Sequence, residues 1–305
     1  MTTQMTEKAF AGFGSKTTAD EVVRGMDLSG RFVVVTGANT GIGYETARGL
    51  ASAGARVLLA CRSAGKAGDA TERIRKRHPK ANVTFAELDL ESFANIRSFV
   101  DSLAAPSIDV LICNAGVLNA SYRESDGGIE HTVGVCHVGH FLLVEGLLPK
   151  LLAADGGRVV IVGSEAHRSP RTLDFEKFPL RADNFSQRGS YGQAKLCNTL
   201  FANELQRRYG DQGLTACSLH PGNLVTTEIG RNSLLARLAV KLVSPFTKSP
   251  AQGAATSVVC AVHPDPMAVA GRYFSHCQLA KMSREAENPE VAKRLWEITE
   301  SWCSD

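Results

Sequence analysis

The fold of this chain is decided by the stretch Phe32-Val33-Val34-Val35-Thr36-Gly37-Ala38-Asn39-Thr40-Gly41-Ile42-Gly43. A short apolar run passes directly into spaced glycines and then into a helical pattern, which predicts a buried strand, a tight turn and a helix. Glycines at such a turn let the backbone approach a pyrophosphate held at the helix N-terminus. The spacing is Gly-x-x-x-Gly-x-Gly rather than Gly-x-Gly-x-x-Gly, so the flanking strand and helix support the interpretation. We therefore expect Gly37, Asn39, Thr40, Gly41, Ile42 and Gly43 to bind a dinucleotide; the alternative is a glycine-rich turn without a ligand.

The same alternation of patterns continues to the end of the chain. Strands are expected at 32–35, 56–60, 83–87, 109–113, 158–162, 214–219 and 272–275. Helices are expected near 42–54, 65–77, 92–103, 127–153, 190–209, 249–262 and 288–302. Right-handed crossovers place a helix over the sheet after each parallel strand. The sequence thus predicts an α/β protein with a doubly wound parallel sheet, a Rossmann fold, buried on both faces.

The composition fits one large globular domain. The chain has 305 residues, of which 44% are hydrophobic and 21% charged. We expect an N-terminal extension over 1–29 packed on a single domain over 30–305, with a long loop over 170–189. The net charge of +3 is small and its basic residues are dispersed, so nucleic-acid binding is not expected.

Eight cysteines lie scattered, mostly in apolar stretches, without a Cys-x-x-Cys pair. This pattern is typical of buried free thiols in a reducing compartment, and neither a disulfide framework nor a zinc site is expected. We find no leader pattern near the N-terminus and no run of the ~20 apolar residues that a membrane span needs. A cytoplasmic protein is therefore expected. Weak contact of the apolar segment 234–243 with a membrane surface stays open, as does a homodimer.

The second expected strand is followed by an arginine, Arg62. An NAD enzyme is expected to offer an acidic residue here, about 20 residues beyond the glycines, to bind the ribose 2′-hydroxyl. Arg62 stands there instead, with Ser63 and Lys66 behind it. Because a guanidinium suits a 2′-phosphate, the sequence favours NADP(H) over NAD(H). The alternative is a solvated arginine at a strand end.

Tyr191 and Lys195 stand four residues apart in the expected helix 190–209. Positions i and i+4 share a helix face, so the ammonium group can lie beneath the phenol and favour its ionised form. A free phenol titrates near ~10 and is a weak acid or base at neutral pH. Tyr-x-x-x-Lys alone is more often an ordinary helix with a half-buried tyrosine. The glycine stretch upstream favours a catalytic pair.

These motifs together resemble a known family in order and spacing. They are the glycine stretch 36–43, Asn114-Ala115-Gly116, Ser164, Tyr191-x-x-x-Lys195 and His220-Pro221-Gly222. The pattern resembles the short-chain dehydrogenase/reductase family over nearly the whole chain. The resemblance implies that Ser164 hydrogen-bonds a substrate carbonyl, Tyr191 donates a proton to it, and Lys195 supports the phenol and binds the nicotinamide ribose. Ser164 has an alternative as a helix N-cap.

The resemblance also implies further cofactor contacts. They are Asp89, Leu90, Asn114, Ala115, Gly116, Pro221, Gly222 and Thr226 or Thr227. The implied activity is NADP(H)-dependent interconversion of a carbonyl and an alcohol on a small apolar substrate that is steroid-, retinoid- or aliphatic-like. The apolar segment 234–246 lies where the family has its substrate lid. We expect no metal site, since the histidines show no ligand order on a common face.

One residue departs from the family pattern. Cys136 stands where similar members carry an asparagine that helps to hold a water linking the lysine to solvent. A thiol is a weak donor and a weak acceptor, so the proton relay is weakened unless a neighbour such as His137 supplies it. This departure keeps open a second hypothesis, a cofactor-binding regulatory scaffold with little turnover. A third hypothesis is light-driven reduction of a tetrapyrrole.

Overall fold

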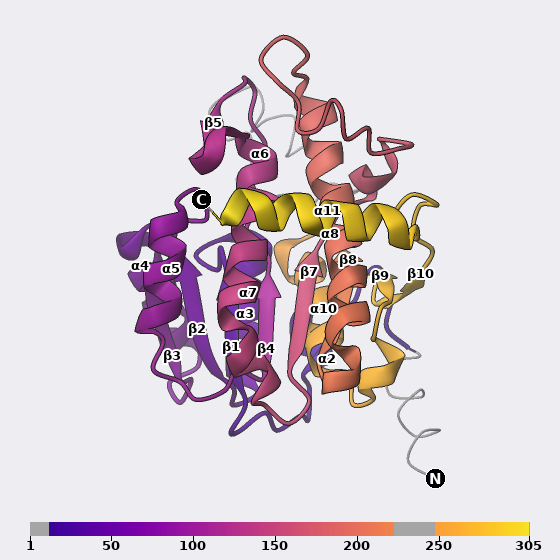
Figure 1. Ribbon diagram of the computed structural model, residues 1–305. Coiled ribbons are helices and arrows are strands. Elements are labelled where there is room, and N and C mark those ends of the chain that lie inside the picture. Colours follow the sequence, from indigo (N-terminus) through magenta and orange to yellow (C-terminus); the bar gives the residue numbers. More distant parts are fainter. Residues whose placement is uncertain (1–11, 223–247, 305) are drawn as a thin grey trace, which may run out of the picture.

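The computed structural model of the protein describes residues 12–222 and 248–304. Thr226, Thr227 and the apolar segment 234–246 lie outside the described residues. Figure 1 shows a central sheet with helices packed over both of its faces. The predicted α/β architecture is confirmed.

The sheet has eight strands, in the order β10-β9-β8-β7-β4-β1-β2-β3. Their bounds are β1 Phe32–Thr36, β2 Arg56–Cys61, β3 Val83–Glu87, β4 Val110–Cys113, β7 Arg158–Val162, β8 Thr215–His220, β9 Tyr273–Ser275 and β10 Gln278–Ala280. All neighbouring pairs are parallel except β9 and β10, which are antiparallel. From β1 the chain runs outward through β2 and β3, then returns to β4 on the other side. Such a switch point opens a crevice at the carboxyl ends of the strands, where ligands bind in open α/β sheets.

Helices cover the two faces and form two apolar cores with the sheet. One face carries α5 Phe93–Ser102, α7 Gly139–Leu152, α8 Gln187–Tyr209 and α11 Pro289–Cys303. The other carries α2 Ala19–Val22, α3 Gly41–Ser52, α4 Ala64–Arg77 and α10 Pro250–Val262. On the first face α11 crosses α8 (Figure 1). The centre of the Trp296 ring lies 4.8 Å from the centre of the Phe141 ring and 5.7 Å from that of Phe201. These rings fix α7 and α8 against each other beneath the crevice.

The expected helix over 127–153 begins later than predicted. Residues 124–130 instead form a short hairpin of β5 Glu124–Ser125 and β6 Ile129–Glu130. Gly127 and Gly128 between them have φ angles of 74° and 64°, which a right-handed helix does not accommodate. The helix starts with α6 His131–Val133 and passes through a π-helical turn, Gly134–Val138, before α7. That turn carries Cys136, and π-helical turns are frequent at functional sites.

The described part of the N-terminal segment packs on the sheet domain. Ala19 is fully buried, and a Cβ added to Gly49 on α3 would lie 3.1 Å from its side chain. Arg48 of α3 is buried and donates to Asp20 at 2.7 Å. The helix α2 is therefore joined to α3 by apolar contact and by an ion pair.

The continuous helix His131–Leu152 is, within the described ranges, the one helix long and apolar enough to cross a membrane. The sequence predicted one helix over 127–153 but no run of the ~20 apolar residues that a membrane span needs. Most of the helix is buried inside the protein, and residues such as Leu143, Val144 and Leu147 lie in the core. Its apolar composition therefore agrees with its place in the core of the protein.

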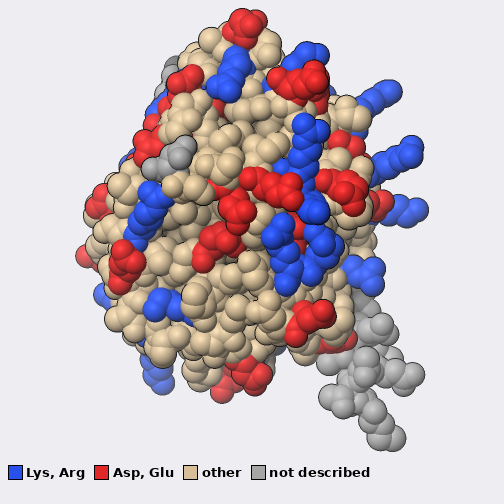
Figure 2. Space-filling view, in the orientation of Figure 1, with Lys and Arg blue, Asp and Glu red and all other residues tan. Residues whose placement is uncertain are grey.

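The surface shown in Figure 2, which carries α8 and α11, has acidic and basic side chains interspersed. Arg207 and Arg208 of α8, for example, both pair with the buried carboxylate of Glu204. All eight cysteines are free and buried, as predicted. In the described parts of the chain, no group of three or more His, Cys, Asp or Glu side chains is arranged to hold a metal ion.

Candidate active site

A cavity of about 480 Å³ lies at the carboxyl ends of the parallel strands. Of the residues predicted to form the site, it is lined by Gly37, Asn39, Thr40, Gly41, Ile42, Gly43, Arg62, Asp89, Leu90, Asn114, Ala115, Gly116, Tyr191, Lys195 and Pro221. Seven lining residues carry no motif and were not predicted: Ala60, Cys61, Leu88, Val117, Val135, Val162 and Gly163. A volume of this size is usual for a site that binds a small molecule or a cofactor.

The glycine turn forms one wall of the cavity. Gly37 and Gly41 have backbone φ angles of 64° and 60°, which residues other than glycine rarely adopt. A Cβ on Gly43 would lie 2.4 Å from the Asn114 amide nitrogen and 2.5 Å from the Gly37 carbonyl oxygen. The helix α3 starts at Gly41, and its N-cap Thr40 makes no side-chain capping bond. The first amides of α3 therefore stay available to an anion in the cavity.

A buried network joins the glycine turn to the end of β4. The Thr36 hydroxyl accepts from the backbone N–H groups of Asn114 and Ala115, both at 2.9 Å. The side-chain amide of Asn114 donates back to the Thr36 carbonyl at 2.8 Å. His140 Nδ1 donates to the Cys136 carbonyl (3.0 Å), so its Nε2 is left to accept from the Thr36 hydroxyl (2.9 Å). Burial lowers the pKa of His140 to about 4, which keeps the ring neutral and suited to this arrangement.

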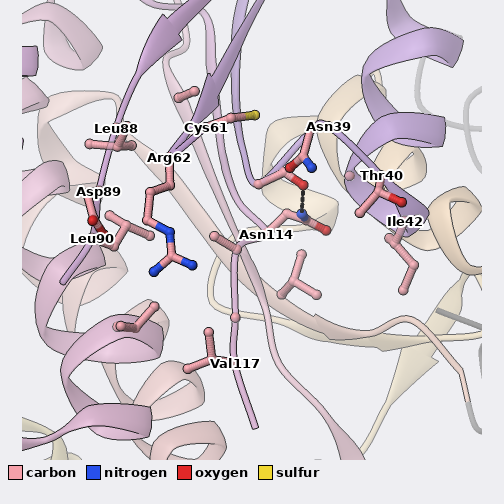
Figure 3. Close-up of a pocket in the computed structure, with 18 of the residues that line it drawn as sticks. Asn39, Thr40, Ile42, Cys61, Arg62, Leu88, Asp89, Leu90, Asn114 and Val117 are labelled. Carbon is pink, nitrogen blue, oxygen red and sulfur yellow. Dashed lines mark hydrogen bonds between the residues drawn. The ribbon is translucent and has the colours of Figure 1, made fainter. Parts of the chain in front are cut away.

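Arg62 stands at the far end of the cavity. Figure 3 shows its side chain beside Asp89 and Leu90, on the opposite side of the cavity from Asn39, Thr40 and Ile42. Its side chain is 65% exposed, and its guanidinium lies 3.6 Å from the Glu91 carboxylate. Glu91 also pairs with Arg123 and His131, and these partners hold the pKa of its carboxyl below the usual range against the opposing effect of burial. The Arg62 side chain is therefore held only loosely, and its guanidinium N–H groups face the solvent and the cavity.

Tyr191 and Lys195 line the cavity from α8. The Lys195 ammonium lies 5.5 Å from the centre of the Tyr191 ring and donates to the Val162 carbonyl at 3.0 Å. Lys195 is only 4% exposed, whereas Tyr191 is half-buried. A buried cation thus lies directly beside a phenol that a ligand can reach. The pairing inferred from the four-residue spacing is present in the structure.

Of the predicted residues that the structure describes, Ser164 and Gly222 lie outside the set that lines the cavity. Ser164 follows β7, and its hydroxyl accepts from the Ala166 amide (3.2 Å), capping the short 3₁₀ helix Glu165–Arg168. The N-cap alternative for Ser164 is thus realised, while its contact with a substrate carbonyl stays a prediction. Gly222 has a φ angle of 118° and packs so tightly on the Lys248 side chain that an added Cβ would lie 2.4 Å from it.

Cys136 is fully buried beside Lys195. A Cβ on Gly116 would lie 3.4 Å from the Cys136 sulfur and 3.5 Å from the Lys195 ammonium, so both groups border the same point. The thiol is held by the backbone of Val117, whose N–H lies 3.4 Å from the sulfur. The Cys136 carbonyl accepts from His140 and, in the amide orientation that satisfies both of its atoms, from Asn198 at 2.8 Å.

His137, next to Cys136, is buried in the core. Its Nε2 bonds the Thr299 hydroxyl of α11 at 2.9 Å, and its ring packs against those of Phe141 and Phe201. Burial lowers the pKa of His137 to about 3, which keeps the ring neutral. One ring nitrogen is thus engaged with α11, and a relay through His137 stays a prediction.

Comparison with known proteins agrees with this geometry. The family model for short chain dehydrogenases matches residues 31–175. The WW domain-containing oxidoreductase of Danio rerio is 41% identical over 296 residues, covering 94% of this chain and 72% of that protein. Retinol dehydrogenase 12 of Mus musculus is 41% identical over 278 residues, covering 90% of this chain and 86% of that protein.

A solved structure of an uncharacterized protein from Mycobacterium paratuberculosis matches with a TM-score of 0.74 at 31% identity, covering 92% of this chain and 95% of that one. The WW domain-containing oxidoreductase and the retinol dehydrogenase thus both match this chain over most of its length. This chain thus has the glycine turn, the strand order and the tyrosine-lysine pair together. It is 31–41% identical to these three proteins over 90% or more of its length. The chain belongs to the short-chain dehydrogenase/reductase family of oxidoreductases.

Proposed function

We propose that the protein is an NADP(H)-dependent oxidoreductase that interconverts a carbonyl and an alcohol on a small, largely apolar substrate. One observation supports the proposal most: Tyr191 and Lys195 line the same cavity as the glycine turn and Arg62. The cavity thus has an anion-binding wall at one end and a proton-donating side chain at the other. When bound there, the dinucleotide would supply or accept a hydride.

Tyr191 is the proposed acid and base. In the reductive direction its phenol gives a proton to the carbonyl oxygen as hydride reaches the carbon, and in the oxidative direction the phenolate takes the proton back. Lys195 is fixed by the Val162 carbonyl at 3.0 Å, so its charge remains beside the phenol throughout the reaction. Ser164, one residue beyond Gly163 of the cavity wall, is the proposed partner of the substrate oxygen.

The preference for NADP(H) is proposed from Arg62. A 2′-phosphate would find the guanidinium at the end of β2, with Ser63 and Lys66 also lining the cavity. Each of these groups can donate to a phosphate oxygen, and an arginine can do so with two parallel bonds. No acidic residue stands at the end of β2, where an NAD enzyme holds the ribose hydroxyl.

The apolar nature of the substrate is proposed from the site and from a relative. Val117 and Val135 line the cavity together with Tyr191. The relative from Mus musculus is named a retinol dehydrogenase, and a retinoid is an apolar molecule with one alcohol or aldehyde group. We infer that a retinoid-, steroid- or aliphatic-like carbonyl compound is the substrate class.

We also propose that the protein is located in the reducing cytoplasm, and its eight buried free thiols support this proposal.

A screen of apolar aldehydes and ketones tests the proposal. NADPH oxidation is followed at fixed enzyme concentration with all-trans-retinal, decanal and a steroid ketone, in the dark, with Tyr191→Phe as the matched control. Turnover in the wild type that is lost in the control supports the proposal. Absence of turnover with every compound contradicts it, and turnover only under illumination would favour tetrapyrrole-type photochemistry instead.

A second candidate function is a cofactor-binding regulator with little turnover. The observation that favours it is Cys136, a buried thiol at the point where Lys195 meets the cavity wall. A thiol holds a water poorly, so resupply of protons to the lysine would be slow. Tight NADPH binding without substrate-dependent NADPH oxidation would support this candidate.

A further inference from the structure

Glu130 is a fully buried carboxylate next to the site whose acceptor positions are all occupied. One carboxylate oxygen accepts from the Thr132 amide and the Thr132 hydroxyl, both at 3.0 Å. The other accepts from the Val133 amide at 3.0 Å and from the Ser190 hydroxyl at 2.6 Å. Three of these donors belong to α6, which the carboxylate caps, and the negative charge lies favourably at the N-terminus of a long helix. The fourth donor comes from α8, 60 residues further along the chain.

Ser190 is the residue directly before Tyr191. It is only 1% exposed, whereas Gln187 and Arg188 before it are exposed. Ser190 is therefore the first side chain of α8 that the protein buries, and its hydroxyl is bonded to a charged acceptor. Bonds of this kind are shorter and stronger than those between neutral groups, which agrees with the 2.6 Å distance.

The bond connects α8, which carries the candidate catalytic groups Tyr191 and Lys195, with the helix that carries Cys136. Glu130 begins the helix whose π turn holds Cys136, and Ser190 belongs to the first turn of α8 with Tyr191. Rotation or displacement of that turn would move the phenol relative to the cavity. A misplacement of about 1 Å can cost about a hundredfold in rate when a reacting group must be aligned.

We propose that Glu130 and Ser190 are positioning residues that fix the Tyr191 phenol for proton transfer. The inference rests on the proposed function, because it assigns Tyr191 the proton. Neither residue lines the cavity, so both act through the tyrosine and not on the cofactor. Loss of the bond between Glu130 and Ser190 should accordingly lower turnover and leave cofactor affinity nearly unchanged.

Ser190→Ala tests the proposal, with Ser186→Ala as the matched control. Ser186 is the exposed N-cap of the same helix and accepts from the Gly189 amide at 3.2 Å, so its loss weakens α8 without touching Glu130. We expect Ser190→Ala to lower kcat about ten- to hundredfold with NADPH affinity within about twofold. We expect Ser186→Ala to keep kcat within about twofold. Retention of more than half of kcat by Ser190→Ala, or an equal loss in both variants, overturns the proposal.

Two further variants separate positioning from general stability. In a Tyr191→Phe background, Ser190→Ala should cause no additional loss of residual activity, because the group that it positions is already absent. Ser190→Thr keeps a hydroxyl and should restore most of the turnover. Additive losses in the double variant, or no rescue by threonine in a folded protein, contradict a positioning role.

A result independent of turnover keeps this inference distinct from the proposed function. If the wild type reduces none of the carbonyl compounds with NADPH, the proposed function fails, and amide hydrogen exchange then decides the inference. Ser190→Ala should speed exchange at residues 190–194 at least tenfold, while residues 200–208 of the same helix stay unchanged. Unchanged exchange at 190–194 overturns the proposal.

Discussion

Replacing Arg62 by alanine should remove the preference for NADPH while leaving the fold intact. The Arg62 side chain is 65% exposed and its guanidinium lies 3.6 Å from the Glu91 carboxylate. An exposed ion pair of this kind contributes only about 0–1 kcal/mol to stability. Its bond to a 2′-phosphate would be charge-assisted and worth roughly 1.5–3 kcal/mol, towards the lower value at so open a site. We therefore expect NADPH affinity to fall about tenfold and NADH affinity to stay nearly constant.

Arg123→Ala provides the matched control. Arg123 pairs with the same Glu91 carboxylate but does not line the cavity. Both cofactors are titrated by fluorescence against the wild type and the two variants at one salt concentration. The ratio of NADPH to NADH affinity should drop in Arg62→Ala alone. Equal affinities in the wild type, or an equal drop in both variants, would refute the role given to Arg62.

Three further predictions concern the site and its core. Lys195→Ala should damage both turnover and NADPH affinity, because the ammonium lies beside the phenol, where the nicotinamide ribose is proposed to bind; an unchanged affinity would count against a ribose contact. Cys136→Asn should raise turnover more than it changes the affinity for substrate, if the thiol slows proton resupply; unchanged or lower turnover with a lower melting temperature would show that the fully buried site rejects the amide. His140 has its pKa lowered by burial to about 4, so the unfolded chain takes up a proton below about 6.5 that the native state refuses. Stability is therefore complete above that pH and falls as pH drops towards 4, by up to ~1.4 kcal/mol per pH unit. His140→Gln should give a flatter curve in urea unfolding between pH 7 and 4.5, and parallel curves would contradict this.

The fold was largely predictable because its central strands are continuous apolar runs that are buried on both faces. Val33-Val34-Val35 and Val159-Val160-Ile161-Val162 lie within β1 and β7, and the expected bounds of the seven parallel strands differ from the structure by at most one residue at either end. The antiparallel strand β10 was missed, since Gln278–Ala280 is short, lies at the edge of the sheet and is not an apolar run. Apolar sequence patterns identify buried strands well, but they do not identify a short, polar strand at the edge of a sheet.

The start of the helix over 127–153 was mispredicted for a different reason. Its periodic apolar pattern continues upstream through Ile129, which is buried in the hairpin and not in the helix. Apolar periodicity does not distinguish these cases, whereas the consecutive glycines Gly127 and Gly128 with positive φ do. The Glu130 carboxylate caps the true start. Because glutamate is not a usual N-cap residue, the two glycines were the signal available in the sequence.

The site was predictable where function depends on local spacing. The glycine turn and the pair Tyr191 and Lys195 each lie within a few residues of one another, so their geometry follows from a turn or from one helix face. The bonds of Thr36 to His140 and of Glu130 to Ser190 join residues 104 and 60 positions apart. Such contacts depend on how α7 and α8 pack, which sequence pattern does not specify.

The most direct test of the account is the turnover of Tyr191→Phe with a carbonyl compound that the wild type reduces. The substitution removes only the phenolic hydroxyl and leaves the ring beside Lys195. The account predicts that kcat falls about 10²- to 10⁴-fold, the usual contribution of general acid catalysis, while NADPH affinity stays within about twofold. A variant that keeps more than about a tenth of the wild-type turnover would contradict the assignment of Tyr191 as the proton donor.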